Sequence, residues 1–588
     1  MDSKHVTEST SGQEDIQKTW WKEAIIYQIY PRSFQDSDGD GIGDLNGITS
    51  RLDYIQSLGV DIIWLNPIFL SPNDDNGYDI SDYREIMREF GTMEDFDRLL
   101  KEIHKREMRL VLDLVVNHTS DEHPWFEEAR KSRHNPYYNY YHWWPAEKGE
   151  PPLRLSYFDE EGNAWTYNKP TDSYYLHYFS RKQPDLNWEN PEVRQEIFDM
   201  MRFWFDKGID GFRMDSISLI AKDPSFPLID SKKYPDIFSF YAKEPRLHLY
   251  LHEMNRQVLS KYDCMSVGEG SAVMVDDVAK FVDPAREELN MLYHFDAARI
   301  RNTTLPDNPE SGIDYSLIAL KKMFTEWDKA VDKGWPSIYL GNHDQPRMVS
   351  RFGSDKDEFR ALSAKMLITF LLTMRGTPYW FAGDEIGMRN IRFDHIEDYN
   401  DIDTINRYKK AKAEGKDPQA VLDEQKETGR DNARTPFQWD RSPEAGFTAG
   451  TPWLKVNPDY TWINVADEEK DPTSILNYFK KVVSFRKENP SLIYGSYHLL
   501  DAENPQSYTF LHKTGADTYL IMLNFSPKAA ISTPGIDMSN AHVLLDNYGD
   551  RSHMAPQKDI TLRPFEAIVF QLNHPVYESF IDSLDLLE

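Results

Sequence analysis

The chain has 588 residues and a formal net charge of −30 at pH 7. A charge this negative argues against a nucleic-acid backbone or an anionic membrane surface as a partner. The only cysteine, Cys264, excludes an internal disulfide, which fits a reducing compartment. The first twenty residues contain no apolar core of a signal peptide, and no stretch approaches the roughly 18 apolar residues of a membrane span. We therefore expect a cytoplasmic protein that is long enough for several cores.

Strand-like runs alternate with helical patterns over most of the chain. They cover residues 24–30, 62–69, 109–118, 210–216, 265–269, 293–297, 336–344 and 377–382. This alternation predicts an α/β fold, a closed parallel (β/α)8 or TIM barrel. Several runs end in polar residues, among them His118, Asp215 and Glu269. Because the site of such a barrel lies at the carboxyl ends of its strands, these residues are candidates for it.

Two long segments interrupt the alternation. Residues 119–185, aromatic and Pro-containing, are too long for an ordinary βα loop. A highly charged insertion at about 390–455 follows the eighth run. From about residue 497 the pattern becomes alternating and turn-rich, which predicts a small antiparallel β domain. We therefore predict a barrel formed by 19–118 and 186–496, an insertion domain over 119–185, and a C-terminal domain over 497–588.

The segment Gly211–Ser216 contains Arg213 and Asp215, which are two residues apart. In a strand they project to the same side, and a guanidinium beside a carboxylate favours its ionised form. An oriented, charged Asp at the end of a strand is what a covalent nucleophile requires. The alternative is a structural ion pair at the mouth of a sheet.

The segment Asp36–Asp44 is an acidic, Gly-rich loop. Its acids at 36, 38 and 40 begin like an EF-hand, but position twelve is Gly47 rather than Glu. Carboxylates are hard oxygen donors, so Ca²⁺ is the expected ion and Mg²⁺ an alternative. The other interpretation is a solvated acidic turn.

Four segments in order resemble the motifs of glycoside hydrolase family 13, the α-amylase family. They are Asp113–His118, Gly211–Asp215, Val267–Glu269 and Asn342–Asp344. Within that family, Gln183–Asn187 and Ala433–Trp439 resemble the oligo-1,6-glucosidase, α-glucosidase and sucrose isomerase branch. The similarity runs from about Trp20 to the C-terminus. It implies an enzyme, a retaining exo-acting α-glucosidase, with a small oligosaccharide or disaccharide as its partner. Separately from the resemblance, we expect a monomer or a homodimer.

The resemblance also implies roles for single residues. Asp215 would be the nucleophile, Glu269 the acid and then the base, and Asp344 a third carboxylate that stabilises the transition state. Crowding by other carboxylates would raise the pKa of Glu269 and keep it protonated.

Further residues are assigned to the substrate and to the metal by resemblance. The substrate set is Asp75, Tyr78, His118, Phe179, Arg213, His343 and Arg430. Arg430, together with Asp75, would close the pocket behind the sugar's O4, which implies exo action. Taken alone, a His or Phe member would more often be a structural or core residue, and the alternative for Arg430 is a salt bridge within the charged insertion. The implied metal ligands are the side chains of Asp36, Asp38, Asp40 and Asp44 and the carbonyl oxygen of Ile42.

Two departures from the family keep alternatives open. Ser216 stands where the branch commonly has Val in α-1,6-preferring enzymes and Thr in α-1,4-preferring ones, so the linkage preference stays open. The segment Arg299–Thr303 keeps arginines but lacks the acids often found in sucrose isomerases. Hydrolysis is favoured, with sucrose isomerisation, glucosyl transfer and trehalose-6-phosphate hydrolysis as alternatives. A non-catalytic relative, like the amylase-like subunits of amino-acid transporters, is disfavoured because Asp215, Glu269 and Asp344 are all present.

Overall fold

The computed structural model describes residues 18–158, 162–515, 517–538, 541–551 and 558–572. Residues 573–588 of the predicted C-terminal domain lie outside these ranges. Residues 1–17, in which we expect no apolar core of a signal peptide, lie outside them as well. None of the helices in the described ranges combines the length and apolar character that crossing a bilayer requires.

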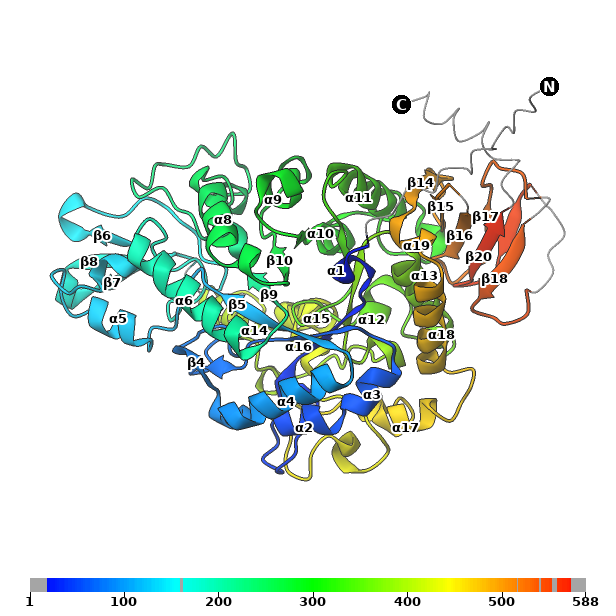
Figure 1. Cartoon of the computed structure of the whole chain (residues 1–588), viewed down its shortest axis with the longest axis horizontal. Helices are drawn as coiled ribbons and strands as arrows, with labels where there is room; N and C mark the ends of the chain where they lie inside the picture. Colours follow the sequence, from blue (N-terminus) through cyan, green and yellow to red (C-terminus); the bar gives the residue numbers. More distant parts are fainter. Residues whose placement is uncertain (1–17, 159–161, 516, 539–540, 552–557, 573–588) are drawn as a thin grey trace, which may run out of the picture.

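Eight parallel strands form the central sheet (Figure 1), in the order β11-β10-β9-β5-β2-β1-β13-β12. Their bounds are β1 Ile26–Ile29, β2 Ile62–Leu65, β5 Arg109–Val115, β9 Gly211–Asp215, β10 Met265–Glu269, β11 Met291–Tyr293, β12 Ser337–Ile338 and β13 Thr377–Phe381. Side chains join the two end strands: Ser337 Oγ donates to the carbonyl of Leu292 (2.8 Å) and the Tyr339 hydroxyl to that of His294 (2.5 Å). The predicted parallel barrel is confirmed.

The predicted runs 62–69 and 109–118 extend past the ends of β2 and β5, and two later runs differ more. The sixth run, 293–297, is wrong beyond Tyr293, where it overlaps the end of β11, because α10 (Asp296–Thr303) begins at Asp296. The backbone N–H of Asp296 donates to His294 Nδ1 (3.2 Å), and this local bond turns the chain out of the strand. The seventh run, 336–344, contains only the two residues of β12. The backbone N–H of Asp344 donates to the Asn342 side chain (2.9 Å), an Asx turn that makes this part a loop.

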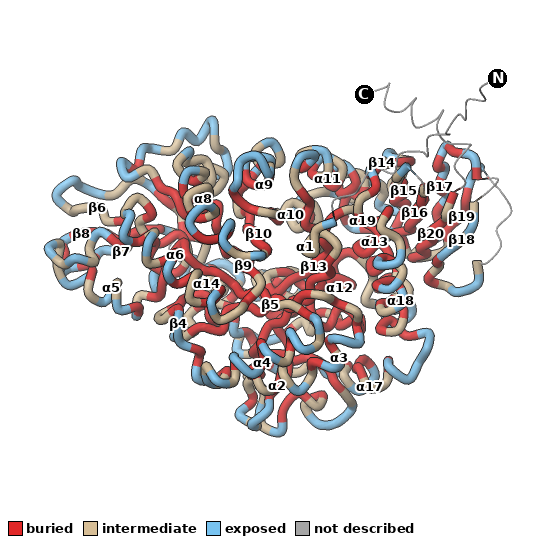
Figure 2. The backbone as a smooth tube through the Cα atoms, in the orientation of Figure 1, coloured by how far each residue is buried: buried red, intermediate tan, exposed pale blue. Residues whose placement is uncertain are grey.

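Helices surround the sheet, so its strands are buried while the outer faces of the helices are exposed (Figure 2). The main ones are α4 Met93–Lys105, α6 Pro191–Lys207, α8 Arg246–Gln257, α11 Leu317–Ala330, α13 Arg360–Thr373 and α18 Ile475–Glu488.

Helix α6 shows how local sequence positions a strand of the site. The Asn190 side chain caps its first turn by accepting from the N–H of Glu192. Apolar side chains at helical spacing are buried in the main core: Val193, Ile197, Phe198, Met200, Met201, Trp204 and Phe205. Gly208, with φ 109°, ends the helix in the left-handed conformation. Strand β9 begins at Gly211 and ends at Asp215.

Two insertions flank the carboxyl ends of the strands. Residues 119–185 contain α5 (Pro124–Ala129) and an antiparallel sheet of β6 (Trp143–Pro145), β8 (Ser173–Leu176) and β7 (Trp165–Asn168). This sheet lies at the opposite end of the molecule from the C-terminal sheet (Figure 1). The charged insertion forms α14 (Ile402–Ala413), α15 (Pro418–Thr428) and the short α16 (Asp431–Arg434).

The C-terminal sheet is antiparallel, in the order β14-β15-β16-β20-β18. Its strands are β14 Ser496–Leu500, β15 Ser507–Lys513, β16 Thr518–Asn524, β18 His542–Asp546 and β20 Ala567–Leu572. Alternate side chains of β16 divide between two cores: Ile521 joins the main core of the barrel, whereas Leu520 and Met522 join a second, separate core. Strand β16 is therefore buried on both faces, which is why Tyr519–Leu523 form a continuous apolar run instead of an alternation with polar residues.

Lys321 of α11 fastens this sheet to the barrel. Its buried ammonium donates to the carbonyl oxygens of Asp501 (3.0 Å), Asn504 (2.8 Å) and Ser507 (3.2 Å). Burial lowers the pKa of Lys321 to about 8, against the attraction of Asp501 and other acids. The ammonium adds a donor to each of these backbone acceptors, of which the carbonyl of Asp501 also accepts from the N–H of Asn504 (3.1 Å).

We expect Lys321→Met to lower the free energy of unfolding of the C-terminal sheet by about 2–4 kcal/mol, because three carbonyl oxygens lose their donor. Hydrogen exchange of the β14–β16 amides measures this change. Lys322→Met is the matched control, because the exposed Lys322 reaches only Glu326 (3.6 Å) and should change stability by less than about 0.5 kcal/mol. Equal exchange rates in the two variants would contradict the role of Lys321.

Candidate active site

A cavity of about 300 Å³ opens at the carboxyl ends of the barrel strands. Members of the predicted set that line it are Asp75, Tyr78, His118, Phe179, Asp215, Glu269, Asp344 and Arg430. Asp215 and Glu269 are the last residues of β9 and β10, and the others come from loops. The two remaining members, Arg213 and His343, are buried and contact residues of this lining. The structure therefore brings the predicted catalytic and substrate residues together.

The guanidinium of Arg213 bonds to three acids of the site. Its guanidinium is fully buried, and Nη1 donates to Asp215 Oδ1 and to Asp113 Oδ1, both at 2.7 Å. Its Nη2 donates to Glu269 Oε2, and its Nε donates to the Tyr293 hydroxyl (2.8 Å). One cation therefore orients three carboxylates that come from three neighbouring strands.

Burial and acidic neighbours favour the protonated form of Glu269. Burial raises its pKa to about 8; Arg213 opposes the shift, while the negative charges of Asp215 and Asp344 add to it. Asp215 is also raised, to a pKa of about 6, by burial and by Asp113 against the attraction of Arg213. Near neutral pH the site therefore favours an ionised Asp215 beside a neutral Glu269.

Asp344 is held ionised on another side of the cavity. Burial opposes its charge, but His343, Arg430 and Arg434 lower its pKa well below the usual range. Asp344 Oδ1 lies 3.2 Å from Arg430 Nη1 and 3.1 Å from Arg434 Nη2. Its neighbour His343 is neutral near pH 7, because burial lowers the pKa of that imidazole to about 3, so at this pH Arg430 and Arg434 supply the positive charge beside Asp344.

Arg430 joins the helical insertion to the barrel loops. It is bonded to Asp401 of the insertion, with Nε 2.8 Å from Oδ1, and it lies 3.6 Å from Asp75. Its guanidinium also stacks on Phe158, 4.7 Å from the ring centre. Arg430 therefore contacts Asp401 of its own insertion and Asp75 of a barrel loop at the same time.

Tyr78 and the two histidines form a neutral polar wall. The Tyr78 hydroxyl is 2.6 Å from His343 Nε2, and the two rings stack with an angle of 8° between their planes. His118 Nε2 is 3.1 Å from the carbonyl oxygen of Tyr78, and its ring packs against Phe179. Burial lowers the pKa of His118 to about 3, so it is neutral at pH 7. Neutral groups of this kind can exchange hydrogen bonds with hydroxyl groups.

Other residues of the cavity were not predicted as site residues. They are Tyr157, Phe158, Ser216, Ser271, Ala272, Phe295 and Arg299. Tyr157 stacks on Phe179 (5.2 Å between ring centres), and Asn406 of α14 donates to the carbonyl oxygen of Phe158 (2.8 Å). No sequence signal marks Tyr157 or Phe158, because they lie in an insertion. Arg434 could have been found from its four-residue spacing after Arg430 on a helical segment.

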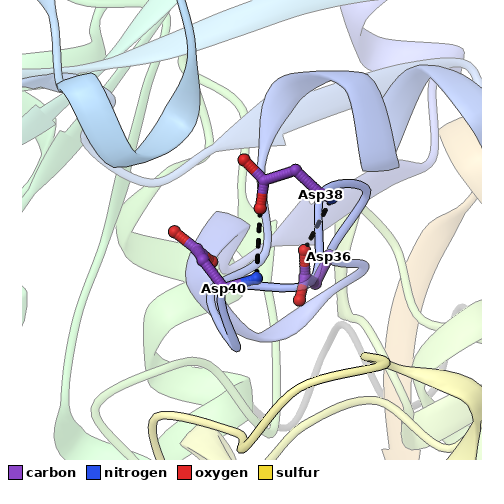
Figure 3. Close-up of side chains that lie close together, drawn as sticks. All are labelled: Asp36, Asp38 and Asp40. Atoms are coloured by element: carbon purple, nitrogen blue, oxygen red, sulfur yellow. Dashed lines mark hydrogen bonds between the residues drawn. The ribbon is translucent and has the colours of Figure 1, made fainter.

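The acidic loop between β1 and α2 (Leu45–Ser50) brings the side chains of Asp36, Asp38 and Asp40 together (Figure 3). One carboxylate oxygen of each lies within 4.8 Å of the others. Burial raises the pKa of Asp40, and the charges of Asp38, Asp36 and Asp44 add to the shift. Hard oxygen donors this close, carrying excess negative charge, fit a bound Ca²⁺.

Asp44 lies outside this group of three. Its Oδ1 accepts from Gly47 N–H (2.7 Å), which caps α2, and its Oδ2 accepts from Ser37 N–H (2.7 Å). The Asp44 side chain therefore stabilises the start of α2 and the loop through these two hydrogen bonds.

Comparisons with known proteins match nearly the whole chain. The family description "Alpha amylase, catalytic domain" matches residues 28–495. Oligo-1,6-glucosidase of Parageobacillus thermoglucosidasius is 51% identical over 571 residues, 95% of this chain and 100% of that protein. Trehalose-6-phosphate hydrolase of Bacillus subtilis (strain 168) is 43% identical over 568 residues, 95% of this chain and 99% of that protein. The crystal structure of isomaltulose synthase from Klebsiella sp. LX3 has a TM-score of 0.90 at 42% identity and covers 95% of this chain and 100% of that one.

Proposed function

The chain belongs to the α-amylase family of glycoside hydrolases, and from that premise we propose that it is a retaining, exo-acting α-glucosidase. It would release glucose from the non-reducing end of short α-glucosides, α-1,4-linked, α-1,6-linked or both. The observation that carries the proposal is the single buried guanidinium of Arg213, which bonds to both Asp215 and Glu269 at the cavity.

In the first step, a carboxylate oxygen of Asp215 attacks the anomeric carbon of the bound glucosyl unit. The bond from this carbon to the glycosidic oxygen breaks, and that oxygen takes the proton of Glu269. The pKa values of about 6 for Asp215 and about 8 for Glu269 support this division of roles near pH 7. Asp344 adds negative charge beside the developing oxocarbenium ion.

In the second step, Glu269 is a carboxylate and acts as the base. It removes a proton from water, and the water oxygen bonds to the anomeric carbon. The ester bond breaks and returns its electron pair to Asp215, so the released glucose keeps its anomeric configuration.

Exo action is supported by the contacts of Arg430. Its guanidinium joins Asp75, Asp344 and Asp401 on one side of the cavity. We propose that Arg430 and Asp75 bind the terminal glucose and close the cavity behind O4, so that a chain enters only by its non-reducing tip.

Sucrose isomerisation is the second candidate, because the similar isomaltulose synthase points to the same glucosyl ester with fructose as acceptor. Of the two arginines in the segment Arg299–Thr303, Arg299 lines the cavity, whereas Arg301 pairs with Asp314 (2.6 Å) and is not among the residues that line it.

A phosphorylated sugar as substrate is less well supported. The two cations of the lining are Arg430, which is bound by three carboxylates, and Arg299, which lies 3.4 Å from Asp296.

We also propose a structural Ca²⁺ in the loop of Asp36, Asp38 and Asp40, with Mg²⁺ as the alternative. When bound, the ion would neutralise the repelling carboxylates and tie the loop together. Asp36 also accepts from the Thr448 hydroxyl, so the loop contacts the last part of the charged insertion.

With maltose, isomaltose, sucrose, trehalose and trehalose-6-phosphate supplied separately, we expect glucose from the first two and glucose plus fructose from sucrose. Proton NMR of freshly released sugar should show α-glucose, because two displacements restore the configuration. Asp215→Asn should lower kcat at least about a thousand-fold with an unchanged circular dichroism spectrum. Isomaltulose or trehalulose as the main product of sucrose would favour the second candidate, and initial β-glucose would rule out a retaining mechanism.

The pH dependence of kcat/KM should be bell-shaped. Activity needs Asp215 ionised and Glu269 protonated, so it should fall below a pH of about 6 and above a pH of about 8. Glu269→Gln should lack the basic limb and act only on aryl glucosides with good leaving groups. Glu288→Gln, at a buried acid paired with His248 (2.8 Å), should keep both limbs. A basic limb that survives in Glu269→Gln would exclude Glu269 as the acid.

Removing Ca²⁺ with a chelator should lower the Tm, and excess Ca²⁺ should restore it, because an ion that binds only the folded state adds about 2.7 kcal/mol at a hundred times its Kd. Differential scanning calorimetry measures the shift. Asp38→Asn should reduce the response, whereas Asp332→Asn, at an exposed acid elsewhere, should leave it intact. A Tm that does not respond to Ca²⁺ or to Mg²⁺ would contradict the site.

A further inference from the structure

The two carboxyl oxygens of Glu269 have different surroundings. Oε2 accepts from Arg213 Nη2 and from the backbone N–H of Ser216 (3.3 Å), and the Tyr293 hydroxyl lies 3.4 Å away. Among the described residues, Oε1 accepts a hydrogen bond from one group, the Ser271 hydroxyl, at 2.9 Å. A guanidinium and a backbone N–H can only donate, so both compete with a proton for the lone pairs of Oε2.

The fold aims the Ser271 hydroxyl at this oxygen by a tight turn after β10. The N–H of Gly270 donates to the carbonyl of Tyr293 (2.8 Å), and the N–H of Val273 donates to the carbonyl of Gly270 (3.1 Å). Ala272 has φ 61°, in the left-handed region that a residue with a Cβ rarely adopts. The Ser218 hydroxyl holds the turn by donating to the carbonyl oxygen of Ser271 (2.5 Å). Contacts on several sides therefore hold an unfavourable backbone in place.

From this geometry, and resting on the proposed function, we propose that the catalytic proton of Glu269 is carried on Oε1 and that Ser271 is the positioning residue that controls it. A hydroxyl is suited to this task because it donates to a carboxylate and accepts from a carboxylic acid after a rotation about its C–O bond. Arg213 and the Ser216 N–H can only donate, so they cannot switch from donor to acceptor when Glu269 changes its charge.

The role of Ser271 follows the two steps of the reaction. Before bond cleavage, Oε1–H donates its proton to the glycosidic oxygen as the bond to the anomeric carbon breaks. Glu269 is then an anion, and the Ser271 hydroxyl donates to Oε1. In the second step Oε1 takes a proton from water while the water oxygen bonds to the anomeric carbon and Asp215 regains its electron pair. The hydrogen bond from Ser271 favours the anion, in the same direction as its lowering contribution to the pKa of Glu269.

Ser271→Ala should move the basic limb of kcat/KM upward by about one pH unit, because the anion of Glu269 loses a donor and its pKa rises. Ser271→Gly removes the same hydroxyl and should show the same shift. Ser271→Thr keeps the hydroxyl and should restore the wild-type limb. Ser218→Ala is the matched control, because it removes a hydroxyl from the segment after β9 (Ile217–Leu219) that contacts the carbonyl oxygen of Ser271 and not Glu269, so its shift should be smaller.

An unmoved basic limb in both Ser271→Ala and Ser271→Gly would overturn the inference, and so would an equal shift in Ser218→Ala. Glu269→Gln separates this failure from that of the proposed function. If Glu269→Gln lacks the basic limb while the Ser271 variants keep it in place, only the inference about Ser271 fails. If the limb survives in Glu269→Gln, the assignment of the acid fails, and the inference fails with it.

Discussion

The site depends on one buried cation, the guanidinium of Arg213. It is fully buried, and its nitrogens contact Asp113, Asp215 and Glu269, which lie on three neighbouring strands. Three carboxylates in a medium of low polarity would repel one another and take up protons. The planar fork of an Arg side chain can donate to all of them in fixed directions, which a Lys side chain cannot do. The sheet therefore presents its acids in one arrangement.

The same balance of charge separates the acids chemically. Burial and two acidic neighbours raise the pKa of Glu269, and the one cation that it shares, Arg213, offsets only part of this shift. Asp344 has two guanidiniums, Arg430 and Arg434, and is held ionised despite burial. The positions of Glu269 and Asp344 relative to the arginines, and not the difference between Glu and Asp, decide which of the two carboxyl groups keeps a proton. Arg430 also links the helical insertion to the barrel, so the shape of the cavity and its charge depend on the same contact.

Much of this arrangement could be predicted from the sequence, for reasons that particular residues make clear. The alternation of runs and helices predicted the barrel, since period and length differ between strands and helices. The ends of the fourth and fifth runs placed Asp215 and Glu269 correctly at the carboxyl ends of β9 and β10. The prediction of the sixth and seventh runs was less accurate, because His294 and Asn342 form local side-chain bonds that end the extended pattern. Such bonds compete with strand pairing and leave little trace in hydropathy.

By itself, the sequence determined the order of the elements, the acids at the strand ends and the acidic loop, because these follow from periodicity and from residue type within short segments. Only the tertiary structure decided that Phe158 and Asn406, from two separate insertions, meet beside Arg430, and that Ser271 bonds to one oxygen of Glu269 and Arg213 to the other. Contacts between segments distant in the chain depend on how loops pack, and the direction of a hydrogen bond depends on backbone angles such as the positive φ of Ala272. Neither is encoded in a local pattern, so the distribution of charge that sets the chemistry of this site emerges only when the barrel closes.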